Sequence, residues 1–260
     1  MSRPAAPRKW RAPPARRGAS AQQAAAAILQ AALAQAKANA RGALDSADPE
    51  FLHQLRVGLR RYRSALRLFR DLLRRKPRRR LARRAREAMR PLGEARDWDV
   101  CIEWLESVRA PQALLRRAKR CGETARKALA PPELALLEPA ASAWKGKSRS
   151  LERFRQQALP KASGKVTQRL RGMNWDQAEE RHRLRIEVKR LRYATDFLGG
   201  DTRALEELQD TLGTLNDLAV VRRLVRRLDP PAGVGRKLAA GERRLLAAAR
   251  RQVASLQTED

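Results

Sequence analysis

The chain has 260 residues, which is room for one large domain or two of ordinary size, and its hydrophobic fraction of 43% is sufficient for a packed core. Lys and Arg number 58 against 28 Asp and Glu, so the formal net charge is +30. So many positive side chains repel one another unless a polyanion neutralises them. This predicts a nucleic acid, an anionic membrane or a polyphosphate as partner. The sequence lacks a run of ~20 apolar residues, a secretory signal and any disulfide or zinc spacing around its two cysteines, Cys101 and Cys121. These absences exclude the membrane-spanning and disulfide-rich classes, and we expect a cytoplasmic protein.

Residues 1–19 contain four prolines, six basic residues and no acidic residue, a composition typical of a disordered basic tail. From Ser20 onward helix-forming residues dominate and no segment alternates apolar and polar residues, so the sequence predicts an all-α fold. Ser20 is a candidate N-cap for a helix ending near Gly42, and Asp48-Pro49 predicts a second helix over residues 50–76. Proline and glycine positions predict further helices over residues 78–90, 98–109, 112–129, 133–157, 163–171, 175–198, 202–228 (broken near Gly213) and 234–256.

An internal repeat is the most informative feature of the sequence. Residues 53–63 read HQLRVGLRRYR and residues 182–192 read HRLRIEVKRLR, and the two histidines of the chain occupy the same place in the two copies. Downstream, LGEARDWDV (92–100) matches LGTLNDLAV (212–220) at Leu, Gly, Asp and Val. The repeat predicts two similar helical halves, over about residues 20–130 and 131–257.

Both copies place basic residues along one face of a helix. At ~100° per residue, one set falls within about 80° of arc beside a face of Leu and Tyr. We call this set the first stripe: His53, Arg56, Arg60, Arg63 and Arg67. The matching set in the second copy is the second stripe: His182, Arg185, Lys189 and Arg192. Asp196 stands where the first stripe has Arg67, so the second stripe is shorter and less positive.

The stripes have two interpretations. A solvated charged face is the ordinary one, but like charges three or four residues apart cost ~0.2–0.5 kcal/mol per pair, and that cost recurs in both copies beside the same histidine. An anion-binding site is favoured, because guanidinium groups suit phosphate oxygens and a row of them suits a linear polyanion. Each histidine is either a neutral hydrogen-bond donor to phosphate or a structural residue.

Other basic residues are weaker candidates. Arg61 and Arg190 lie off the stripes, and Arg79, Arg83, Arg86 and Arg90 form a further row that is either a wider binding surface or a solvated face. The same alternatives hold for Arg222, Arg223, Arg226 and Arg227. Asp97 reads as an N-cap or an arginine partner rather than a catalytic carboxylate, and no cluster of acidic or histidine side chains predicts a metal site or a cofactor.

At HQLRVGLRRYRSALRLF and HRLRIEVKRLRYATDFL, with LGEARD and LGTLND following, the chain resembles the CHAD family (conserved histidine α-helical domain) over roughly residues 20–257. The resemblance implies a pair of four-helix bundles related by a pseudo-two-fold axis, with a central basic groove or channel. It also implies binding of inorganic polyphosphate, association with polyphosphate granules, and a role in binding for both stripes, Arg67 excepted. The triphosphatase domain that precedes CHAD in many relatives is not recognisable in this sequence.

Three functions follow as hypotheses. The leading one is non-catalytic binding of inorganic polyphosphate, with no cofactor. The alternative is non-specific binding of nucleic acid, which +30 makes possible, although an aromatic fraction of 4% offers few stacking platforms and no groove-reading motif is present. An enzyme acting on phosphoanhydrides comes third, because no paired carboxylates for a metal accompany the stripes.

Overall fold

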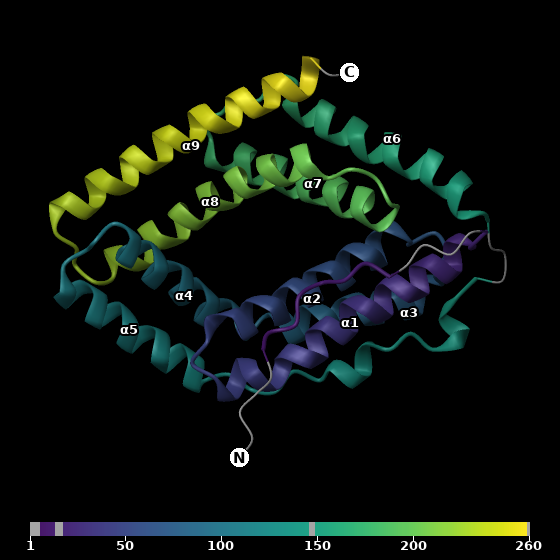
Figure 1. The fold of residues 1–260 in the computed structure, drawn as a ribbon, viewed down its shortest axis with the longest axis horizontal. Helices are drawn as coiled ribbons and strands as arrows, with labels where there is room; N and C mark the ends of the chain where they lie inside the picture. The colour runs from purple at the N-terminus through teal and green to yellow at the C-terminus, as the bar shows by residue number, and fades with distance from the viewer. Residues whose placement is uncertain (1–5, 14–17, 146–148, 259–260) are drawn as a thin grey trace. The chain divides into compact units, whose positions relative to one another are not determined.

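The computed structural model describes residues 6–13, 18–145 and 149–258, which form helices, short connections and no strand (Figure 1). The prediction of an all-α fold is therefore confirmed. The helices are α1 (Ala21–Asp45), α2 (Pro49–Leu68), α3 (Arg75–Met89), α4 (Leu92–Ser107), α5 (Gln112–Lys127), α6 (Leu151–Leu170), α7 (Ala178–Phe197), α8 (Arg203–Arg226) and α9 (Ala232–Thr258), with 3₁₀ turns η1 (Leu134–Leu137) and η2 (Ala141–Ala143). No helix of the described chain is long and apolar enough to cross a membrane.

The first two helices begin where capping chemistry predicts. The Ser20 hydroxyl accepts a hydrogen bond from the backbone N–H of Gln23, and the Gln23 side chain accepts one from the backbone N–H of Ser20. At α2, the Asp48 carboxylate accepts from the Glu50 N–H at 2.9 Å, and Pro49 occupies the first turn. These contacts satisfy N–H groups that have no partner inside the helix.

Several predicted helix boundaries are wrong. The helix expected over 50–76 ends at Leu68, and α3 then begins at Arg75 with Pro77 in its first turn, where a proline costs no hydrogen bond. Residues 133–157 are not one helix, because the backbone of 143–145 instead pairs with that of 72–74. α6 continues through Pro160 and α8 continues through Gly213, so neither residue ends its helix.

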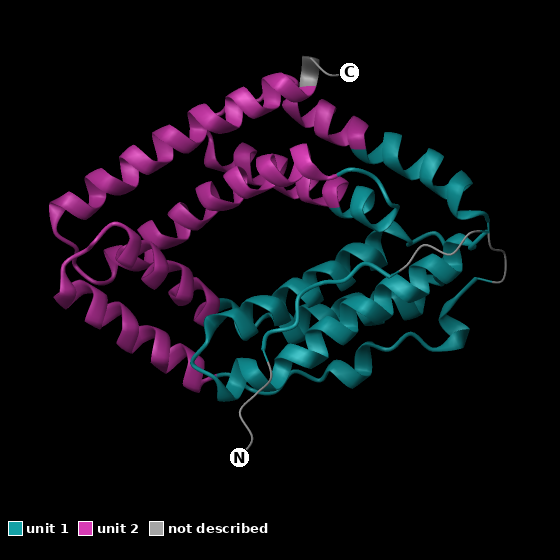
Figure 2. Cartoon of the chain, viewed as in Figure 1, with its two compact units in different colours: residues 1–93, 129–162, 193–201 teal, residues 94–128, 163–192, 202–260 magenta. Residues whose placement is uncertain are grey.

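The chain divides into two compact units (Figure 2). Unit 1 comprises residues 1–93, 129–162 and 193–201, and unit 2 comprises residues 94–128, 163–192 and 202–260. Both units combine segments distant in sequence, and α6 and α7 each contribute to both. The two halves predicted from the repeat are segments of sequence related by duplication. The division into compact units does not test them, so they stay a prediction.

The core of unit 1 is built on the close packing of α1 against α2. Leu52, Leu55, Leu59 and Tyr62 of α2 are fully buried. At the crossing, a Cβ on Gly58 would lie 2.8 Å from the backbone nitrogen of Ala36 and 2.9 Å from the carbonyl oxygen of Ala32. The helices approach this closely because Gly58 has no side chain. Packing of the Leu-rich face fixes the rotation of α2 and turns its basic face away from the core.

Unit 2 has two apolar clusters that share α8 and α9. One joins α8 to α4 and α5 through residues such as Cys101, Leu114 and Val221. The other joins α8 to α6 and α7 through residues such as Leu184, Val188 and Leu212. Leu184 and Val188 are fully buried, which fixes the rotation of α7 as the Leu-rich face fixes that of α2.

Of the basic tail predicted over residues 1–19, residues 6–13 pack on unit 1, and residues 1–5 and 14–17 lie outside the described residues. The side-chain amide of buried Asn39 accepts a hydrogen bond from the Arg8 N–H at 3.0 Å and donates one to the Arg8 carbonyl at 2.9 Å. The Trp10 ring lies 6.0 Å from that of Phe197. This packing depends on one aromatic residue and one buried amide.

Candidate functional site

The first stripe lies along α2, on the face adjacent to the buried leucines. His53, Arg56 and Arg60 are half-buried, whereas Arg63 and Arg67 are exposed. No Asp or Glu occurs between residues 51 and 70, so the charge of this helix beyond its first turn has one sign. An ideal Cβ on Gly93 would lie 3.9 Å from Nη1 of Arg56, which places Gly93 of the LGEARD motif beside the first stripe.

The basic row of α3 meets the first stripe at Arg63. The Arg63 guanidinium donates to Sδ of Met89 at 3.6 Å, and partial burial together with the neighbouring charge of Arg86 lowers the pKa of Arg63. Two cations held close together lower the cost of bringing an anion between them, because the anion relieves their repulsion. Arg79, Arg86 and Arg90 are exposed on this row, and Arg83 pairs with Glu87 at 3.5 Å.

The second stripe lies on α7 in unit 2, and it is less uniform than the first. His182 is exposed, and Arg185 and Lys189 are half-buried. Arg192 is buried, with an exposed fraction of 7%, and donates to Gln209 at 2.8 Å and to Glu206 at 3.1 Å. The repeat makes Arg192 the equivalent of Arg63, but its guanidinium is engaged in an ion pair inside unit 2.

The two arginines off the stripes are both paired with carboxylates. Arg61 is buried, forms an ion pair with Asp196, and lies over the rings of Trp10 at 4.4 Å and Tyr193 at 5.2 Å. Arg190 pairs with Glu187, one turn earlier on α7. These contacts explain why Asp196 replaces the basic residue expected from the repeat: it neutralises Arg61.

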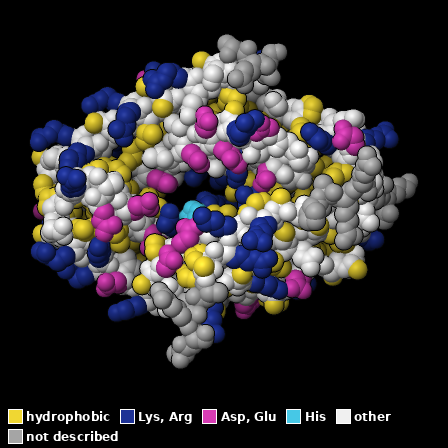
Figure 3. Space-filling view, viewed as in Figure 1, with side chains coloured by type: hydrophobic (Ala, Val, Ile, Leu, Met, Phe, Trp, Pro, Cys, Tyr) yellow, Lys and Arg dark blue, Asp and Glu magenta, His cyan; other side chains and the backbone are white. Residues whose placement is uncertain are grey.

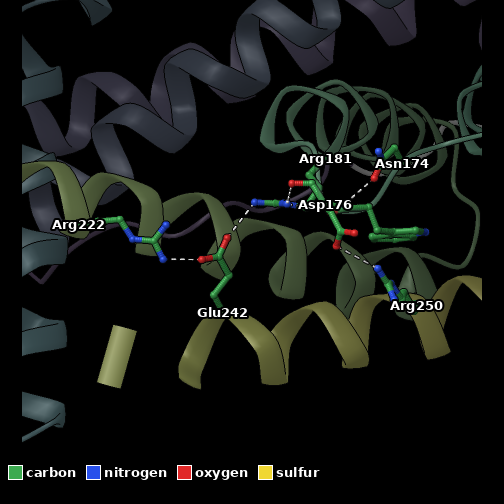
Figure 4. A network of polar contacts seen from close by, with 7 residues as sticks. Asn174, Asp176, Arg181, Arg222, Glu242 and Arg250 are labelled. Atoms are coloured by element: carbon green, nitrogen blue, oxygen red, sulfur yellow. Dashed lines mark hydrogen bonds and ion pairs between the residues drawn. The ribbon is translucent and has the colours of Figure 1, made fainter. Parts of the chain in front are cut away.

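The arginines near the end of α8 belong to structural networks of unit 2 (Figure 4). Glu242 of α9 accepts from Arg222 of α8 and, at 2.9 Å, from Arg181 of α7, so one carboxylate joins three helices. Arg223 pairs with Asp97 at 2.8 Å. Asp97 lies inside α4, so it is an arginine partner and not an N-cap.

Two features of the described side chains bear on catalysis. No group of three or more His, Cys, Asp or Glu residues there could hold a metal ion. Burial and the neighbouring Cys121 raise the pKa of the Cys101 thiol to about 12, which makes Cys101 a poor nucleophile.

On the face drawn in Figure 3, basic side chains gather over parts of both units, with acidic side chains among them. The arrangement is chemically suited to holding anions.

Comparison with known proteins agrees with the motifs. The CHAD domain family matches residues 27–226. The crystal structure of the CHAD domain from the plant Ricinus communis is 28% identical, covers 96% of each chain and superposes with a TM-score of 0.76. PptA from Streptomyces chartreusis, at 15% identity, covers 92% of this chain and 97% of its own, and its TM-score of 0.63 shows a shared fold. No curated protein matches. The repeated histidine motifs, the all-helical structure and the family match together establish that this chain belongs to the CHAD domain family.

Proposed function

We propose that this chain binds inorganic polyphosphate without catalysis, through the first and second stripes. The observation that carries the proposal is the first stripe itself: five basic side chains on one rigid helix, with no acidic residue between positions 51 and 70. A linear anion that follows the helix makes several charge-assisted hydrogen bonds at once. Membership of the CHAD family supports polyphosphate as that anion.

The contacts of the individual side chains refine the set of binding residues. We assign binding to His53, Arg56, Arg60, Arg63 and Arg67 of α2 and to His182, Arg185 and Lys189 of α7. Arg79 and Arg86, on the row that meets the first stripe at Arg63, extend the binding surface, and Arg83 contributes less because it already pairs with Glu87. Arg61, Arg190 and Arg192 have carboxylate partners within their own units, so we assign them to the stability of the fold.

Chain length tests the proposal. Long-chain polyphosphate should bind far more tightly than pyrophosphate or orthophosphate, because only a long chain reaches several cations along the ~21 Å that separate His53 and Arg67 on the helix. The measurement is an isothermal titration with each anion at the same salt concentration. Equal affinity per molecule for pyrophosphate and long chains would overturn the proposal.

Nucleic acid is the alternative ligand, because a net charge of +30 gives any polyanion some affinity. A competition titration of polyphosphate against duplex DNA at about 0.2 M salt separates the two, since counterion release weakens non-specific DNA binding steeply with salt. Polyphosphate should displace DNA at a lower concentration of phosphate groups. Displacement of polyphosphate by DNA would favour the alternative.

A further inference from the structure

Residues 6–13 form a docked segment that runs along the α1–α2 hairpin of unit 1 (Figure 1). Two anchors hold it. Asn39, which is fully buried, pairs with both backbone groups of Arg8 and also donates to the Gln35 carbonyl at 2.7 Å. Trp10 is the second anchor, packed between Phe197 and the Arg61 guanidinium.

The second anchor is rigid because the side chains that contact Trp10 are themselves held by other contacts. The Asp196 carboxylate pairs with Arg61, and the Tyr193 ring packs against both Arg61 and Phe197, the latter at 5.8 Å. A guanidinium is attracted to the π face of an indole ring, more strongly when water is excluded. Arg61 therefore stays paired with Asp196 while the face of its guanidinium packs on the Trp10 ring.

The anchors use the backbone of Arg8 and the ring of Trp10, and leave the charged side chains outside. Arg8, Lys9 and Arg11 are all exposed. Docking therefore presents three cations at a fixed place on unit 1, the unit that carries the first stripe. A free tail would lose the conformational entropy of several backbone residues when it bound an anion, whereas a docked segment has already lost it.

We propose that residues 6–13 are a Trp10-anchored part of the binding surface, and that Arg8, Lys9 and Arg11 contact the polyanion only because Trp10 holds them in place. The inference rests on the proposed function for its ligand, but the docking of the segment is independent of any ligand. The two parts are tested by different readouts.

The first readout is amide hydrogen exchange of residues 6–13 in the full chain without ligand. Trp10→Ala should speed exchange of the Arg8 amide by about tenfold or more, because the segment opens locally. Trp10→Phe keeps a ring over Arg61 and should stay protected. Equal exchange in the wild type and Trp10→Ala would show that Trp10 does not anchor the segment, and would overturn the proposal.

The second readout is the dissociation constant for long-chain polyphosphate at one salt concentration. Trp10→Ala keeps every charge, yet should weaken binding by about three- to tenfold, since the released side chains must then be ordered when they bind. The triple variant Arg8→Ala, Lys9→Ala, Arg11→Ala should lose at least as much, and more than the control triple Arg243→Ala, Arg244→Ala, Arg251→Ala on the exposed face of α9.

Each outcome has one meaning. Faster exchange in Trp10→Ala with unchanged affinity would show a docked segment that contributes nothing to binding, which overturns this inference and leaves the proposed function intact. A wild-type chain that does not bind polyphosphate would overturn both, while the exchange data would still report the docking.

Discussion

Arginine side chains perform two distinct roles in this chain, and their contacts tell the roles apart. Arg63 and Arg192 hold equivalent positions in the repeat, but Arg63 is exposed beside Arg86, and Arg192 is buried against Glu206 and Gln209. The first arrangement raises the local positive potential, and the second neutralises it. Equivalent positions of the repeated motif therefore differ in what their side chains contact.

Substitution of the two arginines should separate binding from stability. Arg63→Ala should weaken polyphosphate binding by about threefold to tenfold through the loss of charge-assisted hydrogen bonds, with the free energy of unfolding unchanged or slightly higher. Arg192→Ala should lower the free energy of unfolding by about 1–3 kcal/mol, because a hydrogen-bonded charge pair is lost, and should leave affinity nearly unchanged. Urea unfolding and polyphosphate titration of both variants measure this. The opposite pattern would mean that Arg192 reaches the ligand.

Residue spacing predicted which side chains share a face of a helix, but not which of them form ion pairs with carboxylates. The helical period depends on the local sequence alone, so the first stripe and its apolar neighbours were predictable. The pairing of Arg192 with Glu206 and that of Arg61 with Asp196 require tertiary packing across 14 and 135 residues, which no periodicity encodes.

At the scale of elements, two glycines have different roles. One allows two helices to pack closely, and the other lies inside a continuous helix. Gly58 sits where α2 meets the backbone of α1, whereas a Cβ on Gly213, inside α8, would meet nothing within 4 Å. Only at Gly58 does contact with a neighbouring helix require a glycine.

Alanine at these two positions should shift stability in opposite directions. Gly58→Ala should lower the free energy of unfolding by about 1–3 kcal/mol through overpacking, even after the gain in helix propensity. Gly213→Ala should raise it by about 0.5–1 kcal/mol, because alanine loses less backbone entropy in a helix. Thermal and urea unfolding report both changes. Equal stabilisation by the two substitutions would contradict the close approach of α1 and α2.

The starts of the first two helices were predictable from local chemistry. Ser20 and Asp48 carry capping groups that act within their own turn, and both predictions are confirmed. The predicted break near Gly213 and the predicted helix end at residue 157 were wrong, because tertiary packing keeps α8 helical through Gly213 and α6 helical through Pro160, residues that weaken an isolated helix. Local chemistry therefore defined the starts, and packing decided the interruptions.

For the whole molecule, we expect binding without turnover. Incubation with polyphosphate or nucleoside triphosphates and Mg²⁺ should release no phosphate above background, because phosphoryl transfer needs positioned metal ions and the described residues include no cluster to hold them. A colorimetric phosphate assay tests this. Turnover abolished by His53→Ala or His182→Ala would assign histidine chemistry to the chain and contradict the non-catalytic account.

The net charge of +30 and a preorganised site make different predictions for the same loss of charge. If bulk charge alone attracts the polyanion, the position of the removed cations is irrelevant, since non-specific affinity scales with the number of phosphates neutralised. If the stripes are a site, their cations act from rigid helices and lose little entropy on binding.

The most direct test removes four charges in two places and measures the polyphosphate dissociation constant of both variants at one salt concentration. The site variant is Arg56→Ala, Arg60→Ala, Arg185→Ala, Lys189→Ala, and the control is Arg116→Ala, Arg120→Ala, Arg243→Ala, Arg244→Ala on exposed faces of α5 and α9. Circular dichroism first establishes that both fold. The site variant should lose at least about tenfold more affinity than the control. Equal losses would contradict the account, because they would show a charged surface without a site.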